Sequence, residues 1–347
     1  MKKYLEEKII SFIGNDRFLS MQIDITNFCN LSCSHCYHTN HKNDGAITLS
    51  DWFKILDQYD GLIKKLNLRG HIIICGGEPL SSQLFYPILD KIKRISTKYH
   101  VTVLTNGTLI HRLNFDLLKD FEKIDFQISL DGPNSEIHDS FRGEGSFVKA
   151  LEGIRKIKEN KLSVYLQATL SRKNGSAIKD FFNLAKELNA DAMNFTRLIE
   201  VGTGELLIQS NNDQPLLGYE LKNVFEEILI QSARSGIKTD TEIPLMNLIH
   251  PALGRKYSFA EGLVIDYQGY LLISSRSRVR ISKVTEENLE KVFFENKEKK
   301  FFLNKDNYEC SSCPHFNSCG GDLNVAYAAS GSFFKKDPGC WYKNETA

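Results

Sequence analysis

The sequence from Met21 to about Arg197 alternates short β-rich runs with longer segments whose apolar residues recur at helical spacing. Continuous apolar runs such as HIIIC (71–75) are typical of strands buried in a parallel sheet. The pattern predicts six strands, at residues 21–26, 71–75, 101–106, 123–130, 162–170 and 191–199. It predicts helices after these strands, at about residues 48–66, 84–97, 113–121, 146–159, 176–188 and 217–234.

Six β-α units in order predict an α/β fold, with a parallel sheet and helices outside it. Six units are fewer than the eight of a full TIM barrel, so we expect a partial (β/α)6 TIM-like barrel. In such folds the chemistry lies at the C-terminal ends of the strands. Four motifs fall at that rim, namely a cysteine loop after the first strand and then CGGEP, TNGT and SLDG after the next three.

The pattern changes after about residue 236, and three regions are expected. Residues 1–20 form an N-terminal helical extension, residues 21–236 the partial barrel, and residues 237–347 a small C-terminal domain. Within the last region, LVIDYQGYLLIS predicts a β-hairpin around Gln268 and Gly269.

Composition and charge exclude some classes of function. The chain has 347 residues, of which 41% are hydrophobic and 25% charged, with a net charge of +1. We see no basic stripe that would indicate a nucleic-acid partner, and no apolar run of membrane-spanning length. The N-terminus lacks a signal-peptide cleavage site, so we expect the chain in the cytoplasm, where clustered cysteines indicate metal sites instead of disulfides.

Three of the eight cysteines, Cys29, Cys33 and Cys36, lie on one loop. Three thiolates at this spacing can hold three irons of a 4Fe–4S cluster and leave the fourth iron free to bind a small molecule. The alternative is a zinc site that takes its fourth ligand from elsewhere. The nearby candidates for that ligand are His35, His38 and His41.

The loop FCNLSCSHCY resembles the signature of the radical S-adenosylmethionine (radical SAM) superfamily, and the resemblance extends through the barrel. It implies that Cys29, Cys33 and Cys36 bind a 4Fe–4S cluster and that SAM binds its open iron. The reduced cluster would then cleave SAM to a 5′-deoxyadenosyl radical, which removes a hydrogen atom from an unactivated C–H bond of the substrate.

The same resemblance implies a set of SAM contacts. The GGEP motif is expected to receive the methionyl amino group, through the backbone of Gly76 and Gly77 and the side chain of Glu78. Arg142 is expected to pair with the carboxylate, since a guanidinium donates two parallel hydrogen bonds. The remaining candidates are His35 against the adenine, Ser129 at the ribose or carboxylate, and Asn106 and Asp131 at the rim, where a turn-capping role is the alternative for the last two.

A second group of cysteines, Cys310, Cys313, Cys319 and Cys340, has enough ligands to close a site. Spacing alone favours a structural zinc ribbon. The segment is also similar to the SPASM extension of radical SAM peptide-modifying enzymes, which implies one auxiliary 4Fe–4S cluster here.

The ligands of the other SPASM cluster are missing. Their places fall near Phe259, on Ser274 and on Leu323. Ser275 occupies the place of the Asp base of sulfatase-maturating members, so that activity is disfavoured.

Single residues leave further alternatives. Cys75 is either a small buried residue or a thiol that donates a hydrogen atom to a substrate radical, as in radical peptide epimerases. Arg197 and Glu200 either bind substrate at the barrel mouth or form surface ion pairs.

The resemblance favours a ribosomally synthesised peptide as substrate, with a cross-link, an epimerised residue or an oxidised side chain as the product. The alternatives are a radical SAM enzyme acting on a small molecule and a non-catalytic zinc-binding module. An electron donor of flavodoxin or ferredoxin type is an expected partner. Because only about twenty residues precede the first strand, leader binding is expected to need either a separate peptide-recognition protein or the barrel rim.

Overall fold

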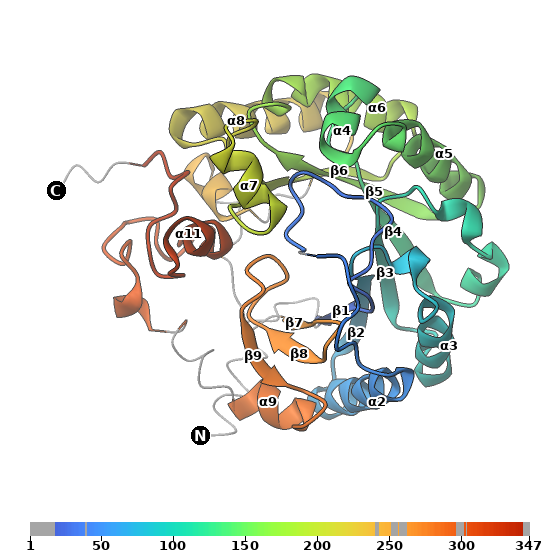
Figure 1. The fold of residues 1–347 in the computed structure, drawn as a ribbon. Coiled ribbons are helices and arrows are strands. Elements are labelled where there is room, and N and C mark those ends of the chain that lie inside the picture. The colour runs from blue at the N-terminus through green and yellow to red at the C-terminus, as the bar shows by residue number, and fades with distance from the viewer. Residues whose placement is uncertain are drawn as a thin grey trace.

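A curved sheet with helices along its outer side dominates the molecule (Figure 1). The structure is a computed structural model and describes residues 18–38, 40–239, 243–250, 256, 262–295, 302 and 304–342. Within these residues the sheet has nine strands, in the spatial order β6-β5-β4-β3-β2-β1-β7-β8-β9. The strands are β1 (Phe18–Asp24), β2 (Arg69–Cys75), β3 (His100–Thr105), β4 (Lys123–Ser129), β5 (Ser163–Leu170), β6 (Ala192–Arg197), β7 (Gly262–Ile265), β8 (Tyr270–Leu272) and β9 (Arg280–Lys283).

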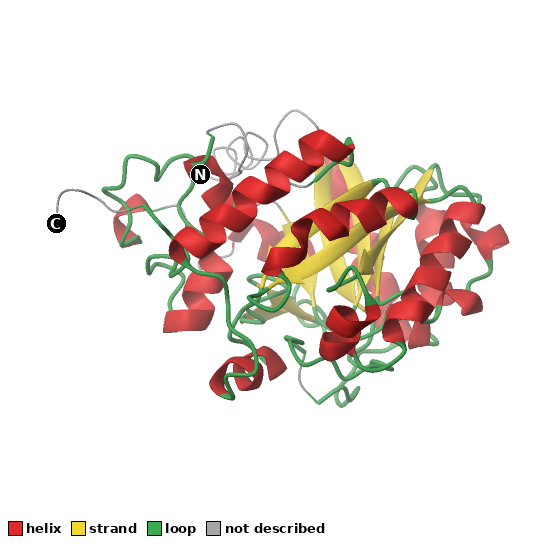
Figure 2. Ribbon diagram, turned by 90° about the horizontal axis from the view of Figure 1, so that it is seen from above, coloured by secondary structure: helices red, strands yellow, loops and turns green. Residues whose placement is uncertain are grey.

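Most of the helices follow the strands and pack outside them, whereas α7 and α11 lie away from this outer layer (Figure 1 and Figure 2). They are α2 (Leu49–Leu66), α3 (Phe85–Ile95), α4 (Ser135–Arg142), α5 (Ser146–Glu159), α6 (Ile178–Glu187), α7 (Thr203–Gln209), α8 (Gly218–Ser235), α9 (Leu289–Glu295) and α11 (Leu323–Ser330). Helix α2 begins where Thr48 and Asp51 form a reciprocal capping box, which satisfies two backbone donors at its start.

The predicted partial barrel is confirmed, since β1 to β6 are parallel and adjacent in sequence order. Parallel neighbours place all C-terminal strand ends at one edge, as the Asp24–Cys75 pair of β1 and β2 illustrates. The strand β1 begins at Phe18, three residues before the predicted start. The rest of the expected N-terminal extension, residues 1–17, lies outside the described residues.

The sheet does not stop at the first strand. β7 pairs in parallel with β1, and β8 and β9 follow as antiparallel strands. The predicted hairpin is present, with Gly269 in the turn at a positive φ of 81°. The hairpin therefore continues the barrel sheet, an arrangement set by long-range pairing and not by local periodicity.

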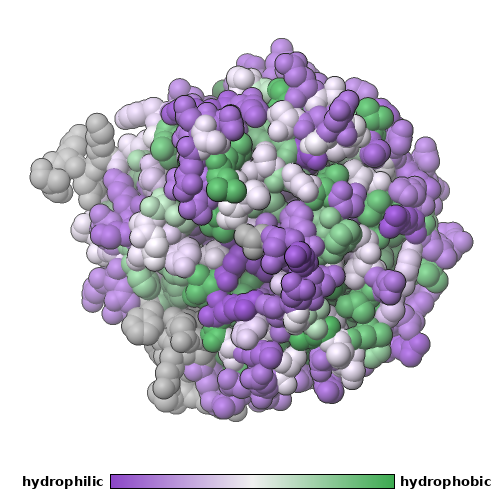
Figure 3. Space-filling model, in the orientation of Figure 1, coloured by the Kyte–Doolittle hydropathy of each residue, from purple (hydrophilic) through white to green (hydrophobic). Residues whose placement is uncertain are grey.

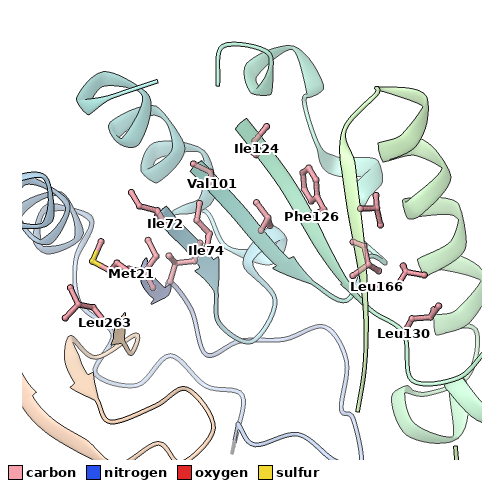
Figure 4. Packing of buried hydrophobic residues seen from close by; sticks show 14 of the residues in the cluster. Met21, Ile72, Ile74, Val101, Ile124, Phe126, Leu130, Leu166 and Leu263 are labelled. Atoms are coloured by element: carbon pink, nitrogen blue, oxygen red, sulfur yellow. The ribbon is translucent and has the colours of Figure 1, made fainter. Parts of the chain in front are cut away.

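Apolar side chains on the outer face of the strands form the core against the helices. Figure 4 shows Met21, Ile72, Val101, Phe126 and Leu166 in this layer, and each is 0% exposed. Burying a side chain of this size contributes about 1.5–3 kcal/mol. The layer therefore fixes the sheet and, with it, the rim where the strands end.

On the opposite, inner face of the strands the side chains are more polar. Gln127 of β4 and Gln167 of β5 face a cavity inside the curve of the sheet. On the outer surface, hydrophobic residues are interspersed among hydrophilic ones over the face shown in Figure 3.

Candidate active site

The C-terminal ends of the strands enclose a cavity of about 450 Å³. Most of the residues predicted to bind a cluster or SAM line this one cavity. They are Cys29, Cys33, His35, Cys36, Gly76, Gly77, Asn106, Ser129 and Arg142, and Cys75 lines it as well. The predicted rim therefore brings together residues at or beyond the ends of four strands, β1 to β4.

The cysteine loop is fixed by two helices that the sequence analysis did not predict. The backbone N–H of Ser34 donates to the carbonyl of Phe141 in α4, at 2.8 Å. At the start of α7, the hydroxyl of Thr203 lies 2.9 Å from the carbonyl oxygen of Cys33 and 3.1 Å from that of Cys36. The signal in the sequence is VGTGE, a glycine-rich turn directly after the sixth strand.

The contact between the cysteine loop and α7 requires a glycine. Gly202 has a φ of +64°, and a Cβ there would lie 2.4 Å from the carbonyl oxygen of Cys36. Only glycine allows both the conformation and the close approach.

Of the three cysteines, Cys33 is buried and Cys29 and Cys36 are half-buried. Burial raises the pKa of Cys29 to about 12 and that of Cys36 to about 11. A bound metal would hold such groups as thiolates. Three thiolates on one loop suit a 4Fe–4S cluster, in which each thiolate binds a different iron.

Gly76 and Gly77 lie directly against the start of the cysteine loop. A Cβ on Gly76 would lie 2.2 Å from the carbonyl oxygen of Thr26, and one on Gly77 would lie 2.3 Å from that of Phe28. The two glycines therefore bring the backbone after β2 against the loop and leave it open to the cavity.

Glu78 does not line the cavity. Its buried carboxylate accepts hydrogen bonds from the hydroxyl of Thr105 at 2.7 Å and from the backbone N–H groups of Asn106 at 2.8 Å and Leu80 at 3.0 Å. It thus fixes the ends of β2 and β3 relative to each other. Its predicted contact with the SAM amino group stays a prediction.

Asn106 reaches from the end of β3 to the cysteine loop. Its side-chain amide donates to the side-chain oxygen of Asn30 at 3.0 Å and lies 3.9 Å from the sulfur of Cys29. Its side-chain oxygen accepts from the backbone of Thr108 at 2.9 Å. Asn106 therefore combines the turn-capping role with a place at the cavity.

Asp131 lies behind the cavity wall and holds two residues that line it. Its Oδ2 lies 2.7 Å from His35 Nε2 and 2.5 Å from Arg142 Nε. Burial alone would raise the pKa of Asp131, but Arg142 and His35 hold it well below the usual range. An ionised carboxylate only accepts, so the Nε2 atom of His35 donates to it. The Nδ1 atom of His35 is buried and has no hydrogen-bond partner among the described residues.

Cys75 ends β2 and is 5% exposed. Its sulfur lies 3.9 Å from the carbonyl oxygen of Gly76, and burial raises its pKa above the ordinary thiol value. The thiol is therefore protonated at neutral pH and lines the cavity. These features are compatible with either alternative for Cys75.

The four C-terminal cysteines line one smaller cavity of about 90 Å³. Ser274 and Leu323, which occupy positions where other SPASM domains have cluster-binding cysteines, lie close together in this structure. The hydroxyl of Ser274 bonds to the side chain of Asn324, and Leu323 packs in a hydrophobic cluster with Tyr308 and Phe333. Hydrogen bonds and apolar contacts fill this place. Phe259 lies outside the described residues.

Neither alternative for Arg197 describes its place fully. The side chain lines the cavity but is 4% exposed, and it forms a bidentate ion pair with Asp337, at 2.7 and 3.0 Å. The expectation of a surface pair is wrong because the C-terminal segment covers the end of β6. Glu200, two residues beyond Leu198, is exposed.

The match to a known family lies in the barrel residues. Residues 23–185 match the family model of the Radical SAM superfamily. The chain carries a radical SAM domain. The cysteine loop, the two glycines, Ser129 and Arg142 all lie inside the matched residues, whereas the four C-terminal cysteines lie beyond them.

Curated proteins are similar to about half of the chain, and two of them illustrate this. The antilisterial bacteriocin subtilosin biosynthesis protein AlbA of Bacillus subtilis is 29% identical over 211 residues, which cover 59% of this chain and 45% of AlbA. The AdoMet-dependent heme synthase of Methanosarcina barkeri is 32% identical over 187 residues, covering 52% of this chain and 51% of the synthase. The aligned region thus spans about half the length of each relative.

Solved structures extend the likeness to nearly the whole chain. Streptococcus suis SuiB bound to S-adenosylmethionine superposes with a TM-score of 0.73 at 17% identity, covering 97% of this chain and 81% of SuiB. SuiB bound to its precursor peptide SuiA gives a TM-score of 0.70 at 16% identity, covering 95% and 78%. At this identity the likeness shows the fold.

Among the described residues, no helix is long and apolar enough to cross a membrane.

Proposed function

We propose that this chain is a radical SAM enzyme that modifies a ribosomally synthesised peptide. One observation carries the proposal. Three cysteines of one loop, a close-packed glycine pair and a half-buried arginine, all within the residues that match the radical SAM family model, meet at a single cavity. Such a cavity can hold a cluster, SAM and the reacting part of a substrate together while limiting access of water.

The proposed cofactors at this cavity are a 4Fe–4S cluster on Cys29, Cys33 and Cys36 and SAM at its open iron. When reduced, this pair supplies a 5′-deoxyadenosyl radical that removes a hydrogen atom from the substrate. The protein contributes binding, orientation and exclusion of competing reactions.

The residues of the chain then take distinct roles toward SAM. Gly76 and Gly77 leave the backbone open to the amino group, and Arg142, oriented by Asp131, donates to the carboxylate. His35 offers its unpartnered Nδ1 atom near the adenine. The residues proposed for the ribose side are Asn106 and Ser129.

A second 4Fe–4S cluster is proposed on Cys310, Cys313, Cys319 and Cys340. All four line one small cavity, so a cluster there would have a complete set of ligands. Such a site has no open iron, and we assign it to electron transfer and not to SAM binding.

A peptide substrate is supported by the relatives. AlbA is named for the biosynthesis of the bacteriocin subtilosin, and SuiB has been solved with its precursor peptide. The proposed outcomes are a cross-link, an epimerised residue or an oxidised side chain. Ser275 lines the cavity and offers no base, which disfavours sulfatase maturation.

A small-molecule substrate is the second candidate, because the heme synthase relative shares a similar length of the radical SAM domain. For either substrate, we propose an electron donor of flavodoxin or ferredoxin type. A separate recognition protein would bind the leader of a peptide substrate.

Anaerobic reconstitution tests the cofactor proposal. The chain should bind the iron of two clusters, turn brown and cleave SAM reductively to 5′-deoxyadenosine. The variant Cys29→Ala/Cys33→Ala/Cys36→Ala should lose SAM cleavage and about half of the iron. Bound zinc without iron would refute the proposal and favour the zinc module.

Co-expression with candidate precursor peptides, followed by mass spectrometry, tests the substrate. A mass change in the peptide that disappears in the triple-alanine variant supports a peptide maturase. Unmodified peptides, together with consumption of a small molecule by the reconstituted enzyme, would favour the second candidate.

A further inference from the structure

The buried ion pair between Arg197 and Asp337 separates the two cavities. Arg197 lines the large cavity at the end of β6, and Asp337 lines the small cavity of the four cysteines. The side chains are 4% and 1% exposed, and two hydrogen bonds of 2.7 and 3.0 Å join them. So little water reaches the pair that its charges are only weakly screened.

The Asp337 carboxylate also holds the segments that carry two of the cysteines. It accepts the backbone N–H of Asp322 at 3.0 Å and that of Gly339 at 2.7 Å. Asp322 follows Cys319 by three residues, and Gly339 directly precedes Cys340. The carboxylate is thus tied by backbone hydrogen bonds to both segments.

The close approach of Arg197 depends on a glycine. A Cβ on Gly339 would lie 2.1 Å from the Nη2 atom of Arg197. The guanidinium therefore packs directly on the residue before Cys340. The cation lies beside the cysteine site as well as beside the carboxylate.

The charges of Arg197 and Asp337 would act on a cluster bound in the small cavity. A 4Fe–4S cluster gains one negative charge on reduction, and net charge nearby is one of the factors that set its potential. A carboxylate beside the cluster disfavours reduction, and a cation beside it favours reduction. Arg197 offsets Asp337, since the two are paired.

We propose that the Arg197–Asp337 pair sets the reduction potential of a cluster bound by Cys310, Cys313, Cys319 and Cys340. This rests on the cofactor set proposed above. The two residues act through charge and position, so they are positioning residues and touch no reacting atom.

The proposal predicts that substitutions of Arg197 and Asp337 shift the midpoint potential of the cluster in opposite directions. Arg197→Gln leaves the carboxylate uncompensated and lowers the midpoint potential, whereas Asp337→Asn leaves the cation uncompensated and raises it. Arg197→Lys keeps the charge and shifts the potential less than Arg197→Gln. The double variant Arg197→Gln/Asp337→Asn returns toward the unsubstituted value. A merely structural role would not give opposite signs.

The experiment uses the full chain with Cys29, Cys33 and Cys36 replaced by alanine, so that the C-terminal cysteines hold the only proposed cluster. Its potential is measured by anaerobic redox titration monitored by electron paramagnetic resonance. The matched control is Arg172→Gln, which removes an exposed ion pair with Glu220 at 2.9 Å and should leave the potential unchanged.

Shifts of the same sign in both single variants, or shifts no larger than that of the control, overturn the inference. If Arg197→Gln loses its iron, Asp337→Asn carries the test, and a lowered potential in that variant overturns it. A chain without any cluster would refute the proposed cofactor set and this inference with it. A cluster with unchanged potentials would refute this inference alone.

Discussion

At the scale of single residues, Asp131 determines how two cavity side chains are presented. One oxygen of its carboxylate accepts hydrogen bonds from Nε of Arg142 and Nε2 of His35. Its other oxygen accepts the backbone N–H of Thr169 at 2.8 Å. The carboxylate is fully buried, so its loss would leave the arginine without a partner for its charge. With the SAM contacts proposed for Arg142 and His35, Asp131 would link the stability of the fold to the binding of SAM.

We expect Asp131→Asn to lower the free energy of unfolding by about 3 kcal/mol, because removing one partner of a buried ion pair leaves an uncompensated charge. SAM binding to the reconstituted chain should weaken at the same time. Denaturant unfolding and equilibrium binding measure the two effects. Asp116→Asn, which breaks the exposed pair with Lys119, is the control and should change neither. Full stability and full SAM affinity in Asp131→Asn would contradict this role.

The two alternatives for Cys75, a packing residue and a hydrogen-atom donor, predict different products. If its thiol donates a hydrogen atom to a substrate radical, Cys75→Ser should still form 5′-deoxyadenosine but should fail to yield the epimerised peptide. Turnover of the unsubstituted enzyme in D2O should introduce one deuterium at the epimerised carbon, because a thiol proton exchanges with solvent. Mass spectrometry of the peptide measures both. Normal product from Cys75→Ser and Cys75→Ala would show that Cys75 is a packing residue.

At the scale of elements, the start of α7 fixes the cysteine loop, and Gly202 is the sharpest place to test this. Gly202→Ala should lower the iron content of the loop, because the added Cβ meets the carbonyl oxygen of Cys36 at 2.4 Å. The control is Gly236→Ala. Gly236 has a similar φ of +73°, but nothing lies within 4 Å of the position of its Cβ.

Both alanine variants should lose some stability through backbone strain, and only Gly202→Ala should lose iron. Iron analysis and thermal unfolding of the two reconstituted proteins separate these effects. Equal iron content in both variants would show that α7 does not position the loop.

Local sequence patterns predict some of these elements and contacts but not others. Strands β1 to β6 were predictable because each is a short β-rich run with buried apolar residues, and the motif residues were predictable because they lie at or just after strand ends. Helices α4 and α7 are 8 and 7 residues long, too short for a clear period, yet both hold the cysteine loop. The burial of Glu78 and the pairing of Arg197 with Asp337 depend on contacts between distant segments, which local patterns do not contain.

At the scale of the whole molecule, the inner face of the sheet carries a second polar region, built from residues nearer the N-terminal ends of the strands. His71 bonds to the hydroxyl groups of Ser20 at 3.0 Å and Thr102 at 2.9 Å, and it stacks on His100 with ring centroids 4.2 Å apart. Asp125 in turn contacts His100 at 2.6 Å. Strands β1 to β4 are therefore joined inside the barrel by polar groups that depend on protonation.

This region predicts that the fold loses stability in acid. Burial, and to a lesser extent the neighbouring His100, lowers the pKa of His71 to about 4, from 6.5 for an ordinary histidine. The unfolded chain therefore binds more protons between these values, so stability is complete above about pH 6.5 and falls as the pH drops toward 4. Denaturant unfolding at pH 7, 6 and 5 measures the slope. His71→Gln should flatten it, whereas His111→Gln, at an exposed position, should not. An unchanged slope in His71→Gln would mean that other groups cause the acid sensitivity.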